Sequence, residues 1–398
     1  MWPSISFVIT LLLIEFLDEF VFGAREAAWP LIRNDLNLKY LQVGLILSLP
    51  MLFSNLVEPV IGILGDVWER RRLILGGGVI FTLALLLVAS SHNFLLLLVS
   101  FIFLYPASGA FVSLSQAALM DMEPERRVQN MARWTFAGSL GIVLGPLTLG
   151  FAAFLSWSWR DLFVGFAILS FVILLVTWRS KFLSKPVDQP TLDSEKKVFA
   201  GFRDGLIGAI QALKRKDVLR WLTLLQFADL ILDVLHGFLA LYFVDVIGFS
   251  PARAGLALAI WTGASLVSDF LLIPLLDRVP DLKYLRISAL IVLFVFPAFL
   301  LVKNPGVKLV LIGLLGFLNA GWYAIPQGHL YAEMPEQSGT VMAVGNIFGL
   351  LGSLIPLGIG FTAQKFGLNV AIWLVILGPL ILVLGLPRTR VKIIAKED

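Results

Sequence analysis

QAALMDMEPERRVQNMARWTFAGSLG (residues 116–141) and QGHLYAEMPEQSGTVMAVGNIFGLLG (residues 327–352) decide the fold, because they align without gaps. Nine of the 26 aligned positions are identical, where a leucine-rich background gives about two or three. The same offset of 211 residues pairs four further positions: Asp18 with Asp229, Gly44 with Gly255, Glu58 with Asp269 and Asp66 with Asp277. Coincidence among apolar helices does not keep polar residues in register, so the sequence indicates an internal duplication.

The composition is that of a membrane protein. Apolar residues make up 58% of the 398 positions and charged residues 15%, against about 25% charged in an average soluble domain. With no cysteine, the chain has neither a disulfide framework nor a thiolate metal site. The three histidines are far apart in the sequence, so we expect no metal site and no bound cofactor.

A helix that crosses a bilayer needs about 20 mostly apolar residues. Twelve such stretches are predicted, at roughly 5–30, 40–64, 73–91, 94–119, 129–155, 160–180, 218–245, 252–276, 285–302, 307–331, 340–363 and 367–386. The chain then divides into a six-helix bundle (1–182), a cytoplasmic linker (183–216) and a second six-helix bundle (217–398). The linker carries Phe199, Phe202, Leu206, Ile210 and Leu213 at helical spacing, which predicts an amphipathic helix on the membrane surface.

The basic residues predict the orientation. With both termini in the cytoplasm, cytoplasmic segments hold 22 of the 31 lysines and arginines, which is the positive-inside asymmetry. The outer loops would hold seven: Arg33, Lys39, Arg160, Arg253, Lys303, Lys308 and Lys365. We therefore expect a multi-pass protein of the cell (inner) membrane, and the basic pI of about 9.3 is explained without nucleic-acid binding. Parallel six-helix repeats place a binding site where the halves meet.

The loop after the second helix carries a recognisable pattern. It reads GILGDVWERRR, with Gly62, Asp66, Arg70 and Arg71 in the positions of a loop motif, although Glu69 replaces a glycine. The second half keeps only Asp277 and Arg278 ahead of Pro280. In this loop and over its full length the chain resembles the major facilitator superfamily. The resemblance implies twelve helices in two bundles, and it implies that Asp66 faces a neighbouring helix end and holds the cytoplasmic side closed. Simple positive-inside anchoring is the alternative for the arginines.

The fifth predicted helix reads GSLGIVLGPLTLG. Its Gly141, Gly145, Pro146 and Gly150 are similar to the glycine-proline motif of drug and proton antiporters in that superfamily, with Leu149 in place of one glycine. Packing alone is the other explanation, since small residues let helices approach closely. The antiporters' arginine on the fourth helix would fall near Tyr105, where this chain has none. A proton relay must then use other residues.

Charged residues lie inside the predicted membrane helices. A charge at the bilayer centre costs about 2.5–3.5 kcal/mol on insertion scales, so it usually faces a cavity or a partner. The first helix places five charged residues within about 120° of its circumference: Glu15, Asp18, Glu19, Arg25 and Glu26. The seventh helix has a comparable stripe of Gln226, Asp229, Asp233 and His236.

These stripes predict the central site. The resemblance implies that helices 1, 4, 7 and 10 line a cavity, to which Gln116, Gln327, Trp322 and Tyr323 would add amide and aromatic surface. Acids outnumber bases four to one on the first helix, and an excess of acids in a partly dry cavity suits proton transfer and attraction of cations. Asp18 and Asp229 are the first candidates for coupling, followed by Glu15, Glu19 and Asp233, and Glu26 is expected to be interfacial. Static pairs, Asp18 with Arg25 or Asp233 with His236, are the structural alternative.

Glu58 and Asp269 lie two turns before Asp66 and Asp277. The resemblance implies that helix 5 faces helix 8, so Arg133 is predicted to pair with Asp269 in one access state. Pairing of Arg133 within its own half is the alternative.

The sequence thus favours a secondary active transporter that exports a small organic compound, cationic or amphipathic, in exchange for protons. Proton-coupled import of a nutrient would use the same acids, and a uniporter or a flippase for a lipid-like molecule also stays open. A membrane enzyme would need a reactive constellation that the scattered histidines do not supply, and the phosphate-binding loop of a nucleotide-driven pump is missing. Proton, bilayer and small-molecule substrate are the expected partners, and a monomer is what the resemblance implies.

Overall fold

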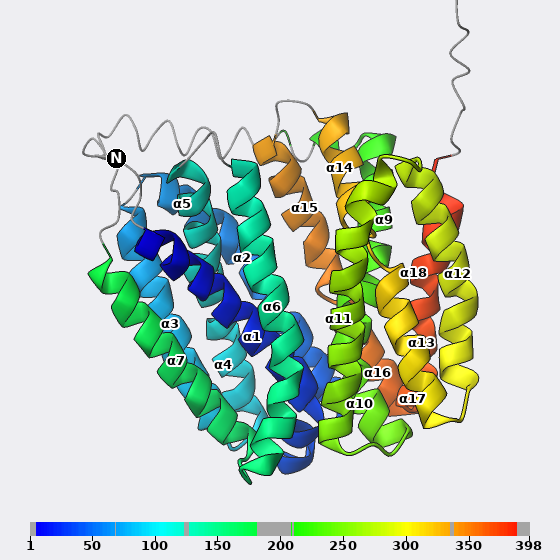
Figure 1. The fold of residues 1–398 in the computed structure, drawn as a ribbon, viewed down its shortest axis with the longest axis horizontal. Coiled ribbons are helices and arrows are strands. Elements are labelled where there is room, and N and C mark those ends of the chain that lie inside the picture. Colours follow the sequence, from blue (N-terminus) through cyan, green and yellow to red (C-terminus); the bar gives the residue numbers. More distant parts are fainter. Residues whose placement is uncertain are drawn as a thin grey trace, which may run out of the picture.

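The computed structural model describes residues 5–67, 69–122, 127–180, 208, 211–334 and 338–387. Within these ranges the regular structure is helical and contains no strand. Figure 1 shows the two halves side by side, with the first seven labelled helices on the left and those from α9 onward on the right. The predicted linker helix lies outside the described residues, except for its last positions.

The N-terminal half crosses the bundle six times. Its elements are α1 (Ile5–Asp35), α2 (Tyr40–Val67), α3 (Arg70–Ala89), the continuous run of α4 (Phe94–Ser108), η1 (Gly109–Ser113) and α5 (Leu114–Met122), α6 (Arg127–Phe154) and α7 (Trp159–Arg179). α1 has 31 residues and crosses the half obliquely in Figure 1. The turn η1 is π-helical.

The C-terminal half repeats the pattern. Its elements are the run of α9 (Lys216–Asp229), η3 (Leu230–Val234), α10 (Leu235–Leu241) and η4 (Tyr242–Val246), then α11 (Pro251–Leu276), α12 (Asp281–Leu301), α13 (Pro305–Leu318) with α14 (Ala324–Glu333), α15 (Ser338–Gly352) with α16 (Ile355–Phe366), and α17 (Leu368–Ala371) with η5 (Ile372–Ile376) and α18 (Leu377–Gly385). Ten described stretches are long and apolar enough to cross a membrane, and Pro305–Leu318 is a shorter apolar helix. With the charged helix α1, these give the twelve crossings that the sequence predicts.

The helices begin where the sequence provides caps. The Asn93 side chain accepts a hydrogen bond from the Leu96 amide at 2.9 Å, and Ser158 and Asp161 form a reciprocal capping box. Asn304 caps α13 ahead of Pro305. Capping satisfies amides that have no partner within their helix, and proline fits the first helical position because it has no amide to satisfy. The three caps start α4, α7 and α13 directly after short connections, which lie at the same end of the bundle.

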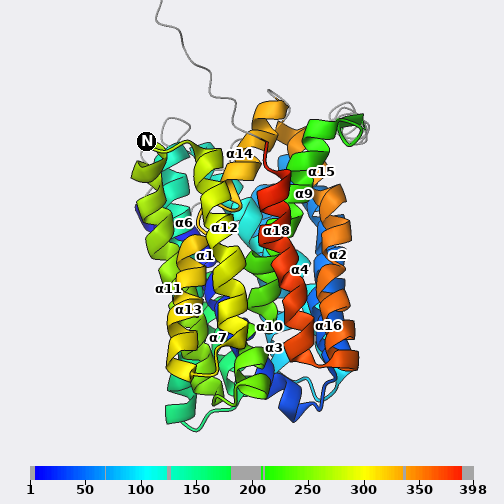
Figure 2. The same cartoon turned by 90° about the vertical axis from the view of Figure 1, so that its right-hand side faces the viewer.

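We call this end, where α1 ends and α2 begins, the distal end. The proximal end is the one where α9 begins and α18 ends (Figure 2). In the predicted orientation the distal end is extracellular and the proximal end cytoplasmic.

Glycines bring α6 against α1 within the first half. A Cβ atom at Gly141 would lie 2.5 Å from the Phe16 carbonyl oxygen, and one at Gly145 would lie 2.5 Å from the Ala24 amide nitrogen. Backbones this close exclude any side chain. A Cβ atom at Gly150 would meet nothing within 4 Å. The glycine-proline motif of α6 therefore serves packing at two of its three glycines.

Glycines also bring the two halves together near the distal end. A Cβ atom at Gly44 of α2 would lie 2.7 Å from the Pro356 carbonyl oxygen of α16. A Cβ atom at Gly255 of α11 would lie 2.7 Å from the Pro146 carbonyl oxygen of α6. Gly44 and Gly255 are partners under the 211-residue offset, so the duplicated halves meet at two equivalent backbone contacts.

The tenth crossing differs from its prediction as one helix over 307–331. α13 ends at Leu318 and α14 begins at Ala324, and Gly321 between them has a φ of +72°. Ser265 and Tyr284 satisfy groups at this break: the Ser265 hydroxyl donates to the Asn319 side-chain oxygen at 3.0 Å, and the Tyr284 hydroxyl donates to the Ala320 carbonyl at 3.2 Å. Irregular backbone inside a membrane protein persists where side chains or water satisfy it.

Lys308 also differs from its predicted place in an outer loop. It lies in α13 and is 2% exposed. Its ammonium donates to the Tyr242 hydroxyl at 3.0 Å and to the Phe299 and Leu300 carbonyls at 2.5 and 3.2 Å. The carbonyls at the end of α12 have no partner within that helix, so they supply acceptors that the sequence pattern does not reveal.

Candidate functional site

The acidic stripes of the two halves face each other. Glu19 on α1 interacts electrostatically with Asp233 on η3, and Asp233 in turn interacts with Arg25 and Glu26 of α1. Asp233 is exposed to solvent although it lies in the middle of its transmembrane run. Because Glu19, Arg25 and Glu26 belong to the other half, the accessible surface of Asp233 lies between the halves.

The C-terminal half adds an acid pair and a tyrosine to this space. Asp229, half-buried at the end of α9, interacts with Asp233 one turn further on. Tyr323, beside the break between α13 and α14, is 58% exposed and interacts with both aspartates. Asp233 sits in the π-helical turn η3, and π-helical turns are frequent at functional sites because they redirect side chains.

The acids of α1 divide between two environments. Asp18 accepts a hydrogen bond from the Ser108 hydroxyl at 2.8 Å, just before the π-helical turn η1. Glu15 is 9% exposed and lies against Gly138 of α6, where a Cβ atom would be 2.6 Å from its Oε1 atom. Glu19 is half-buried. Of these three acids, Glu19 is the one with a charged neighbour in the other half, Asp233, whereas Glu15 packs within its own half and Asp18 is held by Ser108 of that half.

Arg25 does not form the pair with Asp18 that the structural alternative predicts. Its Nε donates to Glu26 Oε1 at 3.1 Å, its Nη2 pairs with the same oxygen, and its Nη1 donates to the Tyr105 hydroxyl at 2.8 Å. The guanidinium also lies over the Phe22 ring, 4.4 Å from its centroid. Tyr105 marks the place on the fourth crossing where the resemblance implied an arginine, and here the arginine reaches that place from α1.

Glu26 was expected at the membrane interface, and this prediction is wrong. Its residue exposure is 2%, and Trp29 donates to its second oxygen at 3.2 Å. The ion pair with Arg25 and the indole hydrogen bond account for the burial, since a buried carboxylate needs a counter-charge and donors. Next to this pair lies His236 of the other half, 3% exposed and stacked on Phe22 with ring centroids 6.0 Å apart.

The three predicted cavity glutamines differ in their surroundings. Gln116 donates to the Met131 sulfur at 3.6 Å, which joins α5 to α6. Gln226 lies directly against Gly352 of α15, and Gln327 is half-buried on α14. Gln116 and Gln226 thus contact neighbouring helices of their own halves.

Trp322 does not supply the aromatic cavity surface that the sequence suggests. It is completely buried, and its indole nitrogen donates to the Ser288 hydroxyl of α12 at 2.8 Å. The break between α13 and α14 turns neighbouring side chains apart, so Tyr323 faces the acids and Trp322 faces the core of its half.

The loop residues assigned to gating lie at the proximal end. Arg71 donates to the Trp178 carbonyl at 2.7 Å and so ties α3 to α7. Gly62, Asp277 and Arg278 are exposed, Arg70 is half-buried, and the side chain of Asp66 lies outside the described residues. The contact of Arg71 therefore acts within the N-terminal half.

Arg133 donates to the Asn130 side-chain oxygen at 3.3 Å. Among the residues that the structure describes, it forms no ion pair with Asp269. Glu58 accepts a hydrogen bond from Ser54 at 2.7 Å and interacts electrostatically with Asp18. In this conformation the predicted Arg133–Asp269 pair is open.

The distal end is closed by contacts across the halves. Asp245 of η4 accepts hydrogen bonds from Arg33 at 2.9 Å and from the Tyr40 hydroxyl at 2.8 Å. Deeper in the bundle, Ser48 accepts from the Leu357 amide at 2.9 Å. These contacts between described residues lie between the distal end and the middle of the bundle. The space with the acids is therefore shut on the distal side.

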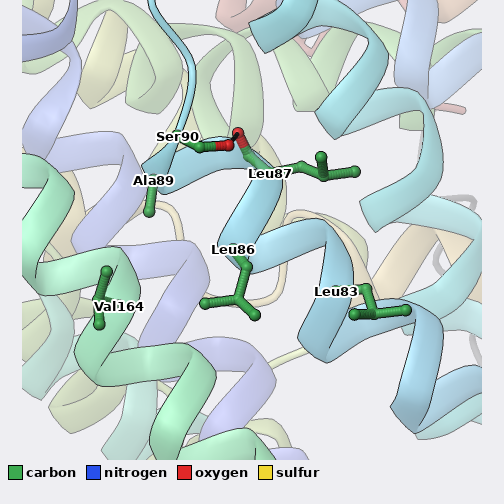
Figure 3. A pocket seen from close by; sticks show the side chains of 6 residues that line it. All are labelled: Leu83, Leu86, Leu87, Ala89, Ser90 and Val164. Carbon is green, nitrogen blue, oxygen red and sulfur yellow. Dashed lines mark hydrogen bonds between the residues drawn. The ribbon is translucent and has the colours of Figure 1, made fainter.

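One groove lies away from these residues. It has a volume of about 680 Å³ near the distal ends of α3 and α7 and is lined by Leu83, Leu86, Leu87, Ala89, Ser90 and Val164 (Figure 3). Its leucines are exposed on the outside of the N-terminal half, where a bilayer covers such side chains. Its lining residues carry no charge, and the candidate site stays with the acids between the halves.

Sequence reasoning did not assign Tyr105 and Ser108 to the site, and it placed Glu26 outside it. Tyr105 ends the hydrophobic run FLLLLVSFIFLY and Ser108 follows it, and polar residues at the end of such a run were the available signal. Spacing alone could not show that Arg25 pairs with its immediate neighbour, because adjacent residues on a helix point about 100° apart.

Two duplicated six-helix halves, with charges of both at their interface, define a secondary membrane transporter. Residues 11–357 match the Major Facilitator Superfamily, so the chain belongs to that superfamily and is a membrane transporter, not an enzyme.

Solved structures share the fold at low identity. A mutant of the nucleoside transporter NupG aligns with a TM-score of 0.77 and 13% identity over 96% of this chain and 98% of its own. A bacterial homologue of the human lysosomal transporter Spinster, inward-facing and unoccupied, aligns at 0.72 and 16% identity over 97% and 95%. The peptide transporter POT with sulfate aligns at 0.71 and 17% over 95% and 94%. No protein of curated function matches the sequence.

Proposed function

We propose that this transporter couples proton movement to the export of a small organic compound that is cationic or amphipathic. The observation that carries the proposal is the meeting of carboxylates from both halves, Glu19 with Asp233, in a space shut at the distal end. Asp18 lies beside Glu19, and Asp229 lies beside Asp233. A proton and a cation compete for such carboxylates, so binding of one favours release of the other. Rocking of the halves would then expose the same acids to each side in turn.

The orientation and assembly belong to the same proposal. Both termini lie in the cytoplasm, the protein sits in the cell membrane as a monomer, and the closed distal end is extracellular. This orientation rests on the excess of lysine and arginine in the predicted cytoplasmic segments. In it, the acids face the cytoplasm in the present conformation and are placed to collect a substrate there.

The test uses the reconstituted full-length protein in vesicles that contain a pH-sensitive dye. Organic cations are added under an imposed proton gradient, and proton flux that depends on the cation supports coupling. Asp18→Asn and Asp229→Asn should each abolish the cation-dependent flux. Asp35→Asn on α1 and Asp217→Asn on α9 remove the same charge from the same elements outside the space, and flux should persist in both. Undiminished flux in Asp18→Asn and Asp229→Asn would overturn the proposal.

Import of a nutrient with protons is the second candidate. NupG and POT, whose folds this chain shares, are described as nucleoside and peptide transporters. The same vesicles separate the two directions, because an antiporter moves protons out of the compartment that the cation enters, whereas a symporter moves cation and proton into the same compartment. A uniporter or a flippase would show transport with no proton flux.

A further inference from the structure

The buried pair of Arg25 and Glu26 stands at the boundary between the halves. Both side chains are nearly inaccessible, 5% and 2% exposed, and the pair is completed by the Trp29 indole, which donates to Glu26 at 3.2 Å. A buried pair of adjacent residues is neutral as a unit. It therefore has a different effect on its surroundings from that of either charge alone.

Glu26 lies where equivalent positions of the duplicated halves meet. The 211-residue offset pairs Glu26 with Gly237 and Arg25 with His236. A Cβ atom at Gly237 would lie 3.5 Å from Glu26 Oε2. The carboxylate thus occupies space that a side chain of the other half leaves free, close to the axis that relates the halves.

Arg25 is the base whose charge reaches the acids of the site. It interacts electrostatically with Asp18, Glu19 and Asp233. Glu26 interacts with Asp233 from nearly the same place. At Asp233, the acid of the other half, the two charges oppose each other, so Glu26 offsets the positive charge of Arg25 there.

We propose that Glu26 sets the charge preference of the transporter: by cancelling Arg25, it leaves the space between the halves negative, so that an organic cation is selected over an anion of the same shape. This inference rests on the proposed function, which makes the substrate a cation. Glu26 acts here as a positioning residue, since its own contacts are with Arg25, Trp29 and the other half.

The guanidinium has supports that do not depend on Glu26. The Tyr105 hydroxyl accepts from it at 2.8 Å, and it lies over the rings of Phe22 and Phe101 at 4.4 and 5.8 Å from their centroids. Replacing Glu26 by glutamine keeps an oxygen to accept from Arg25 or Trp29. The substitution therefore uncovers one positive charge near the acids without removing the side chain that carries it.

The experiment compares two ions of the same shape and opposite charge, tetraphenylphosphonium and tetraphenylborate. Binding to the purified full-length protein is measured by equilibrium dialysis against protein-free micelles, for the unaltered protein, Glu26→Gln and the double variant Arg25→Gln/Glu26→Gln. A unit charge about 10 Å away at an effective dielectric constant of about 20 changes affinity roughly tenfold. We expect Glu26→Gln to weaken binding of the phosphonium about tenfold and to strengthen binding of the borate, and the neutral double variant to restore both.

Two further variants serve as controls. Glu26→Asp keeps the charge and should keep the preference for the phosphonium, which tests the inference even if Glu26→Gln does not fold. Asp217→Asn makes the same change of net charge at the exposed start of α9, with a side chain 62% exposed, and should change neither affinity.

The outcomes separate the inference from the proposed function. If the unaltered protein binds no phosphonium, the cation of the proposed function is refuted, and this inference is refuted with it. If it binds phosphonium and Glu26→Gln binds it equally well, only the inference is refuted. Equal loss in Glu26→Gln and the double variant would show a structural effect instead of a charge effect, and would also overturn it.

Discussion

Asp245 is the carboxylate that joins the halves at the distal end, and its loss should open that end. It accepts from Arg33 at 2.9 Å and from the Tyr40 hydroxyl at 2.8 Å, and both donors belong to the N-terminal half. Asp245→Asn keeps an acceptor for Tyr40 and removes the charge that holds Arg33. The conformational equilibrium should therefore shift from the distally closed state toward the distally open state.

The magnitude follows from the burial of the pair. The side chains of Arg33 and Asp245 are 23% and 16% exposed, so the pair lies between an exposed ion pair, worth about 0–1 kcal/mol, and a buried hydrogen bond to a charged group, worth about 1.5–3 kcal/mol. A loss of about 1–2 kcal/mol changes the ratio of the two states about 5- to 30-fold. Such a change is large enough to be seen as a redistribution of populations.

The chain contains no cysteine, so spin labels can be attached at two introduced cysteines without removing native ones. Asn34 on α1 and Lys303 after α12 are exposed at the distal end, one in each half. Pulsed electron paramagnetic resonance on Asn34→Cys/Lys303→Cys should show a longer distance whose population increases in Asp245→Asn.

Asp35 provides the matched control. It pairs with Arg160 of α7 at 2.5 Å, so Asp35→Asn removes an ion pair at the same end that stays within one half. The distance distribution should be unchanged in this variant. An unchanged distribution in Asp245→Asn as well would refute the role of Asp245 in closing the distal end.

Three further predictions concern stability and packing. Lys308→Met should lower the free energy of unfolding by about 1–3 kcal/mol, because helix-end carbonyls lose their donor, and thermal denaturation in detergent measures this; an unchanged midpoint contradicts it. Gly145→Ala should destabilise by about 1–3 kcal/mol or more through overpacking against α1, while Gly150→Ala, which meets nothing within 4 Å, should leave the melting temperature unchanged; equal midpoints would contradict the packing role. Gly44→Ala should push the halves apart and raise the distally open population in the same spin-label assay, and a purely closed population would count against it.

The architecture could be predicted from the sequence because each of its signals is local or repeated. Twelve apolar stretches and the 211-residue offset are both visible in one dimension, and both agree with the helices of the structure. The stripe of acids on α1 was also readable, because helical periodicity places Glu15 beside both Asp18 and Glu19 on one side of the helix. The offset then pairs Asp18 with Asp229 in the second half.

The partners of these charges could not be predicted in the same way. The Arg25 side chain pairs with its neighbour Glu26, because Tyr105 of another crossing and the Phe22 ring hold the guanidinium beside that carboxylate. Such a choice among acids depends on the packing of helices far apart in the sequence. The break at Gly321 was hidden for a similar reason, since Ser265 of α11 binds the Asn319 side chain and Tyr284 of α12 satisfies the Ala320 carbonyl there.

The paired contacts at Gly44 and Gly255 define an axis of rotation between the two halves. At each of these two contacts a glycine of one half meets the backbone of the other, and a line through two fixed points leaves a rigid body a single rotation. Rotation of one half about this line displaces its proximal end far, while the backbone contacts on the line move little. The duplication therefore gave the transporter two copies of one glycine contact, and with them a direction in which its halves are free to turn.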